Sequence, residues 1–96
     1  MRRATRLDAN QAKIVAALRT IGASVHDTSA VGRGFPDLVV GFRGRNWLIE
    51  CKDGSKRPSA RKLTPEQVEF KVGWRGHWAV AISAEDAVAI VMSQGG

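Results

Sequence analysis

The strongest constraint on the fold is a hairpin of two short apolar segments joined by a tight turn. Residues 37–42 and 47–52 each have the pattern of a strand, and Pro36 opens the first of them. A proline is tolerated at the first position of a strand because it removes no interior ladder hydrogen bond. The segment between the strands predicts a turn centred on Arg43-Gly44.

A turn at that place fixes the register of the two strands and brings Asp37 level with Glu50. Because side chains alternate across a strand, Glu50 and Lys52 share one face, whereas Cys51 lies on the other. A strand between helices would be apolar on that face if its role were purely structural. The pattern therefore predicts that Asp37, Glu50 and Lys52 converge at one end of the sheet.

Helix and strand signals around the hairpin follow the order α-β-β-β-α-β-α. The other predicted elements are a helix from about 10 to 21, strands at 23–28 and 77–83, and helices at 64–74 and 84–92. This order predicts an α/β fold in which helices flank a mixed β-sheet with a central hairpin. A chain of 96 residues suits one domain and is too short for two, so we expect a single domain over residues 1–96.

The start of the second predicted helix has the clearest local signal. Thr64, Pro65 and Gln67 match the N-cap, the first helical position and the N3 position of a capping box. The box explains Gln67 without any function, so a structural and a functional role both stay open for it. The first helix can be capped by Asp8 or by Asn10.

The charge of the chain favours a polyanionic partner. A net charge of +6 and an isoelectric point of about 10.5 are typical of proteins that bind nucleic acid. One basic cluster stands at the start, and another follows the strand at 47–52. The side chains that we expect to contact DNA phosphates are Arg33, Lys56, Arg57, Arg61 and Lys62.

Two carboxylates and a lysine suit metal-dependent hydrolysis of a phosphodiester bond. Asp37 and Glu50 offer the hard oxygen ligands that Mg²⁺ and Mn²⁺ prefer, and the backbone carbonyl of Cys51 is a further candidate ligand. A bound metal ion lowers the pKa of water and neutralises charge that develops on the phosphate. Lys52 can orient or deprotonate that water, so the expected activity is that of a DNA endonuclease.

The residues of this cluster also resemble a known signature. A Pro-Asp pair at 36–37, followed by Glu-Cys-Lys at 50–52, is similar to the PD-(D/E)XK nuclease motif. Together with the approach Gly-Arg-Gly-Phe-Pro-Asp at 32–37 and Leu-Thr-Pro-Glu-Gln at 63–67, the whole chain resembles the stand-alone virus-type replication-repair nuclease (VRR-NUC) domains of phages and prophages.

The resemblance implies a restriction-endonuclease-like core with metal-binding and catalytic roles for Asp37, Glu50 and Lys52. It places Gln67 on a helix beside the site. It also implies a homodimer that cuts DNA, with a preference for branched substrates such as four-way junctions.

The first helix departs from the family pattern, which often supplies an extra acidic residue there. The corresponding segment is Asp8-Ala9-Asn10-Gln11. Asp8, Asn10 or Gln11 could act as an additional site residue, and the number of metal ions stays open at one or two.

Structural interpretations compete with these assignments. Glu50 and Lys52 could form a surface ion pair on an exposed edge strand. Cys51 faces away from the charged pair, which favours a small core residue over a nucleophile. The alternative functions are a catalytically inactive DNA-binding module with a nuclease-like fold and a protein-interaction subunit. The complete set of Asp37, Glu50 and Lys52 favours the enzyme.

A membrane or secretory role is not expected. No apolar run approaches the roughly 18 residues of a membrane span, and no apolar stretch follows the basic start. The single Cys51 suits the reducing cytoplasm of a bacterium or a phage-infected cell. A homodimer would enlarge the small DNA-contact surface of such a short chain. The side chains considered for its interface are Trp47, Trp74, Trp78, Val88 and Val91.

Overall fold

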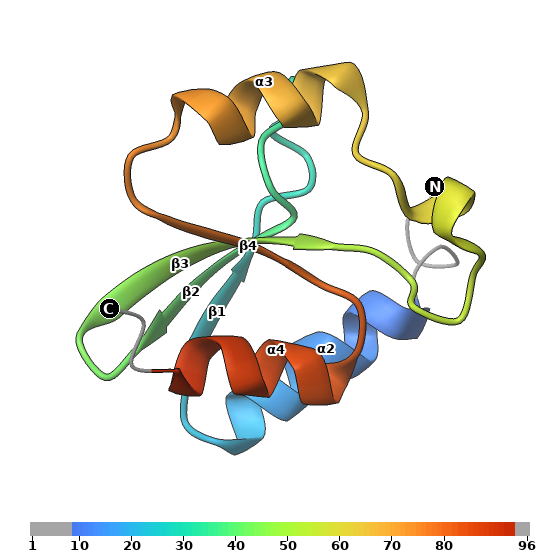
Figure 1. Ribbon diagram of the computed structural model, residues 1–96. Helices are drawn as coiled ribbons and strands as arrows, with labels where there is room; N and C mark the ends of the chain where they lie inside the picture. Colours follow the sequence, from blue (N-terminus) through green and yellow to red (C-terminus); the bar gives the residue numbers. More distant parts are fainter. Residues whose placement is uncertain (1–8, 94–96) are drawn as a thin grey trace.

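The computed structural model describes residues 9–93 of the chain, which form one sheet with helices on both faces (Figure 1). Its elements are α2 (Ala9–Thr20), β1 (Ser24–Asp27), β2 (Leu38–Phe42), β3 (Arg45–Cys51), the 3-10 turn η1 (Pro58–Arg61), α3 (Pro65–Gly73), β4 (His77–Ala81) and α4 (Ala84–Met92). The predicted order and the predicted α/β class are confirmed. The element that the sequence did not predict is η1, which lies in the basic cluster after the predicted strand at 47–52.

The sheet has the strand order β1-β2-β3-β4. The β1–β2 and β2–β3 pairs are antiparallel and the β3–β4 pair is parallel, which makes the sheet mixed. Leu38 pairs with Ile49 and Phe42 with Arg45, so the register predicted for the hairpin is confirmed. Both turn residues have positive φ, 53° at Arg43 and 79° at Gly44, as a two-residue hairpin turn requires.

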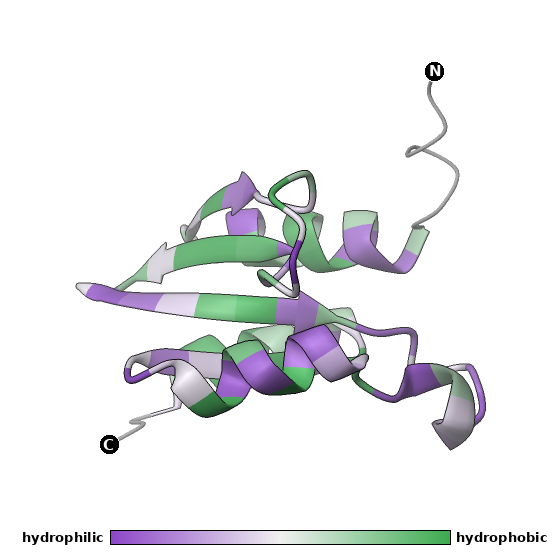
Figure 2. Ribbon diagram, turned by 90° about the horizontal axis from the view of Figure 1, so that it is seen from above, coloured by the Kyte–Doolittle hydropathy of each residue, from purple (hydrophilic) through white to green (hydrophobic). Residues whose placement is uncertain are grey.

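The core lies between the sheet and the two helices α2 and α4, which cover the same face (Figure 1). Each helix presents a pair of buried side chains four residues apart, Ile14 and Leu18 on α2, Ala87 and Val91 on α4. Figure 2 shows the apolar colour along the middle of the strands and the hydrophilic colour at the hairpin tip. No helix of the described residues is long and apolar enough to cross a membrane.

Helix α3 lies alone on the opposite face of the sheet and buries none of its described side chains. It is held by its capped start and by aromatic contacts, since the rings of Phe35 and Phe70 meet edge to face with centroids 5.2 Å apart. Gly34, with φ of +80°, passes so close that a Cβ there would overlap the carbonyl of Glu66. The loop before β2 is therefore packed against the start of α3, beside the predicted catalytic cluster.

Candidate active site

Asp37 stands at the entry to β2, where backbone contacts fix it on both sides. Its carbonyl accepts a hydrogen bond from the amide of Thr28 at 2.7 Å. Its carboxylate Oδ2 accepts one from the backbone amide of Cys51 at 2.8 Å, across the hairpin. The hairpin register thus brings the Asp37 carboxylate to the end of β3, as predicted.

Glu50 points from β3 toward α3 and is 3% exposed, the one buried charged residue of the described chain. Burial, together with the hydrogen bond and the negative charge of Asp37, raises the pKa of its carboxyl group to about 8. The positive charge of Lys52 acts the other way. The Glu50 carboxyl group therefore holds a proton more strongly than a solvent-exposed glutamate does.

Gln67 connects the lysine and the glutamate. Its Nε2 donates to Glu50 Oε2 at 2.9 Å, and its Oε1 accepts from Lys52 Nζ at 3.1 Å. The same Oε1 accepts from the backbone amide of Thr64 at 2.8 Å, and Thr64 Oγ1 accepts from the Gln67 amide at 3.2 Å. The predicted capping box is present, and its glutamine also contacts both charged side chains of β3.

Lys52 completes the cluster, with Nζ 3.9 Å from Glu50 Oε2. β3 lies between β2 and β4, and Glu50 is buried, so the interpretation of a surface ion pair on an exposed edge strand is wrong. The two charged side chains lie on the α3 face of an interior strand, where packing alone would favour apolar residues.

The donor set fits a small divalent cation. Two carboxyl groups in hydrogen-bonding contact supply hard oxygen atoms, and a cation bound there would replace the proton that the raised pKa of Glu50 retains. Within residues 9–93, no group of three or more His, Cys, Asp or Glu side chains could hold a metal ion. Further ligands would have to be backbone carbonyls, such as that of Cys51, or water.

Comparison with solved structures identifies the fold. A structure described as a VRR_NUC domain superposes with a TM-score of 0.59 at 26% sequence identity, and the match covers 88% of this chain and 91% of that one. The chain has the VRR-NUC fold. It is a nuclease-like domain, as the sequence motif indicates. No family model and no curated protein sequence matches it.

The first helix of this VRR-NUC fold does not bring a third carboxylate into the described site. Asp8 lies outside the described residues. α2 begins at Ala9, so Asn10 is inside its first turn rather than at its cap. The Asn10 amide contacts backbone carbonyls beyond β3, and Gln11 donates to Asp27 Oδ2 at 3.3 Å, away from the cluster.

The glycine-flanked Arg33 lies in the loop that approaches the site. Gly32, Arg33 and Gly34 all have positive φ, 78°, 56° and 80°, so the chain turns sharply there, as the two glycines indicate. The Arg33 side chain is exposed. Its contact with a DNA phosphate stays a prediction.

The basic segment directly follows β3 and extends away from the end of that strand (Figure 2). Lys56, Arg57 and Lys62 are exposed, while Arg61 is half-buried and donates from Nε to the Lys56 carbonyl at 2.8 Å. η1 gives this segment a defined shape, which its Pro58-Ser-Ala-Arg61 sequence does not predict.

Some contributors to the site have only a weak sequence signal. The backbone amide of Cys51 and the ring of Phe35 act through tertiary contacts that no local pattern identifies. Phe35 adjoins the Pro-Asp pair, and that proximity is the signal that could have drawn attention to it.

Proposed function

We propose that this protein is a Mg²⁺- or Mn²⁺-dependent endonuclease that hydrolyses phosphodiester bonds in DNA. The observation that supports this proposal most directly is the contact between the carboxyl groups of Asp37 and Glu50. Gln67 hydrogen-bonds both to Glu50 and to Lys52, so all of these groups meet at the end of an interior strand. The VRR-NUC fold supports a nuclease over other uses of the same residue types.

Each residue has a distinct task in this proposal. Asp37 and Glu50 would hold the metal ion, with the Cys51 carbonyl as a further ligand. When bound there, the ion supplies Lewis-acid activation of water and offsets charge on the phosphate. Lys52 orients the attacking water and stabilises the charge of the transition state. Gln67 keeps Lys52 and Glu50 in place through its two side-chain hydrogen bonds.

DNA is the proposed substrate because of the charge around the site. The exposed cations Arg33, Lys56, Arg57 and Lys62 lie on the two segments that border it, and Arg61 lies in the second of these. Cations at such positions contact phosphates and set the orientation of a duplex without reading its sequence.

We also propose that the protein forms a homodimer and that it prefers branched DNA. The interface residues considered from the sequence are only partly available, because Trp47 and Val91 are 7% and 3% exposed and belong to the core, against which Val88 packs. Five large apolar side chains of the described residues are exposed; three of them lie on α3 or just after it, while Val31 and Met92 lie elsewhere. Val72, Val68 and Trp74 are 77%, 45% and 42% exposed, and we propose them as the interface.

Incubation of supercoiled plasmid with Mg²⁺ or Mn²⁺, with and without EDTA, tests the activity. Nicking or linearisation that EDTA abolishes supports the endonuclease, whereas binding without cutting supports the inactive DNA-binding module. A panel of linear, flapped and four-way DNA tests the finer claim. Equal cutting of linear and four-way DNA of the same length would refute structure selectivity and leave the nuclease intact.

The residue range of the domain and its cellular compartment stay predictions. We propose that residues 1–96 belong to one domain, that this domain is of the phage type, and that it works in the cytoplasm. Limited proteolysis, which cuts between domains more readily than within them, tests the first statement.

A further inference from the structure

The chain beyond Lys52 leaves the sheet through a series of backbone contacts with β4. The Lys52 amide donates to the Ala81 carbonyl at 3.0 Å, and the Gly54 amide donates to the Ile82 carbonyl at 3.0 Å. A Cβ at Gly54 would stand 2.9 Å from that same carbonyl oxygen, so only glycine permits the close approach. This segment sets the backbone from which the Lys52 side chain extends.

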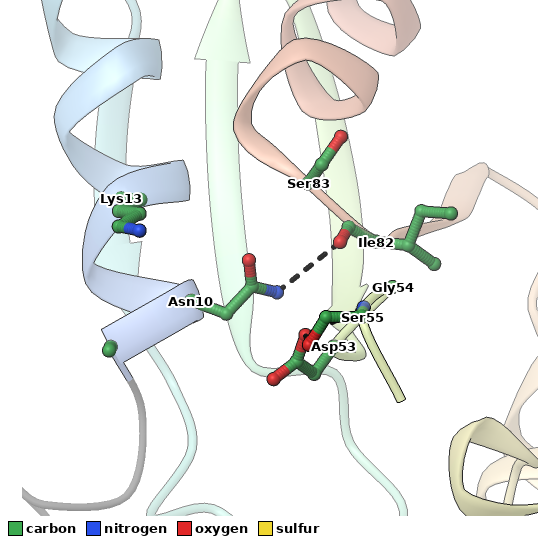
Figure 3. A pocket seen from close by; sticks show the side chains of 8 residues that line it. Asn10, Lys13, Asp53, Gly54, Ser55, Ile82 and Ser83 are labelled. Atoms are coloured by element: carbon green, nitrogen blue, oxygen red, sulfur yellow. Dashed lines mark hydrogen bonds between the residues drawn. The ribbon is translucent and has the colours of Figure 1, made fainter. Parts of the chain in front are cut away.

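Asn10 donates hydrogen bonds to two backbone carbonyls at the ends of β3 and β4. Its Nδ2 donates to the Lys52 carbonyl at 2.8 Å. The same Nδ2 donates to the Ile82 carbonyl at 3.4 Å, the contact drawn as a dashed line in Figure 3. The side chain comes from the first turn of α2, 42 residues away from Lys52 in the sequence. One amide group thus bridges the ends of β3 and β4 where their ladder stops.

We propose that Asn10 is a positioning residue that fixes the Lys52 backbone and thereby the place of the Lys52 ammonium group. The inference rests on the proposed nuclease function. Asn10 acts from the α2 side of the sheet, whereas the ammonium group lies on the α3 side with Gln67 and Glu50. Asn10 therefore reaches the chemistry through the main chain of Lys52 and touches no reacting atom.

The energetic case depends on the geometry that Lys52 must keep. Its Nζ is 3.1 Å from Gln67 Oε1 and 3.9 Å from Glu50 Oε2. A displacement of about 1 Å in a catalytic group can cost on the order of 100-fold in rate. Loss of the Asn10 amide leaves the half-buried Lys52 carbonyl without this donor, and the segment after β3 gains freedom to shift.

A cavity of about 420 Å³ lies beside Asn10 and makes a chemical test feasible. It is bordered by Lys13 of α2, by Asp53 and Ser55 after β3, and by Ser83 at the start of α4 (Figure 3). A small primary amide such as acetamide is the side-chain group of asparagine in free form. Truncation of Asn10 to alanine would open room for it next to the two carbonyls.

The experiment compares single-turnover cleavage by Asn10→Ala and by the wild type, at saturating Mn²⁺ and well below the unfolding temperature. We expect the maximal rate to fall roughly 10-fold to 100-fold with an unchanged half-saturating DNA concentration. Acetamide should restore part of the rate, and N,N-dimethylacetamide, which lacks the N–H donors, should not. Asn10→Ser, which keeps one donor, should lose less rate and serves as second variant if the alanine protein folds poorly.

The matched control is Arg19→Met, which removes another bond from a side chain of α2 to a strand carbonyl, that of Val25 at 3.2 Å. It should lower stability without lowering the maximal rate. The inference would be overturned by any of three results: unchanged cleavage by Asn10→Ala, an equal rate loss in Arg19→Met, or no rescue by acetamide. In each case cleavage by the wild type would still support the proposed function. Failure of the wild type to cut DNA would refute the proposed function, and the inference with it.

Discussion

Gln67 donates its side-chain amide to the buried carboxyl group of Glu50 at 2.9 Å, from the first turn of a helix that buries none of its own described side chains. The hydrogen bond links the stability of α3 to the geometry of the site. A flipped amide would place its NH₂ against Lys52 and its oxygen against Glu50. The backbone amide of Thr64 prevents this because it requires the oxygen at its own position.

The capping box of α3 should therefore affect catalysis as well as stability. Thr64→Ala and Ser83→Ala each remove an N-cap hydroxyl, from α3 and α4 respectively, and each should cost about 1 kcal/mol in the free energy of unfolding. Only Thr64→Ala should also lower the maximal cleavage rate, and Thr64→Ser should restore it. Denaturant unfolding and single-turnover assays measure the two effects. Equal rates in the two alanine variants would show that the cap has no role in the site.

The raised pKa of Glu50 predicts a pH-dependent stability of the metal-free protein. Below pH 4.5 the carboxyl group is protonated in the folded and the unfolded chain alike, so its contribution is fully present. Between pH 4.5 and about 8 the folded protein retains a proton that the unfolded chain has lost, and stability falls as the pH rises.

Unfolding by urea in EDTA across this range measures that dependence. Glu50→Gln, which is uncharged at every pH, should lack the part of the decline that Glu50 causes. Added Mg²⁺ should stabilise the wild type more at pH 8 than at pH 6, because binding displaces the proton. A wild type and a Glu50→Gln variant with parallel pH profiles would contradict the raised pKa.

The basic segment after β3 should determine the salt dependence of DNA binding. Each phosphate contact that is lost reduces the slope of log K against log salt by about 0.9. The quadruple glutamine variant of Lys56, Arg57, Arg61 and Lys62 should therefore have a shallower slope on every DNA sequence. A control variant with the same loss of charge replaces Arg19, Arg43, Lys71 and Arg75. If both variants changed the slope equally, the effect would come from net charge rather than from this segment.

The exposed apolar residues of α3 predict the site of dimer formation. Sedimentation at micromolar concentration should give twice the chain mass of 10.4 kDa. Val72→Lys should yield the monomer, whereas Met92→Lys, at a 41% exposed position on α4, should leave the dimer intact. A wild-type mass of one chain would rule out the dimer, and dissociation by Met92→Lys would place the interface elsewhere.

Local sequence patterns were sufficient for the hairpin and for the capping box. The turn at Arg43-Gly44 set the register, and the register alone brought Asp37 to the end of β3. Thr64 and Gln67 are three residues apart, a spacing at which helix geometry decides the contact. These parts of the candidate site could be predicted because short-range geometry determines them.

Contacts between distant elements could not be predicted in the same way. Gln67 reaches Glu50 only because α3 crosses that face of the sheet, and Asn10 reaches the Lys52 carbonyl over 42 residues. The burial of Glu50 depends on the same packing, and so does its raised pKa. The sequence pattern marked these residue types as unusual for a strand, but it contained no information on what covers them.

The most direct test of the proposed site is plasmid cleavage by Asp37→Ala, Glu50→Gln and Lys52→Met beside the wild type, in Mg²⁺ or Mn²⁺. Circular dichroism and the unfolding temperature verify that each variant is folded. The proposed mechanism predicts that each variant loses about 100-fold or more in rate, and that EDTA abolishes cutting by the wild type. Cleavage close to the wild-type rate by any correctly folded variant would contradict the assignment of the active site.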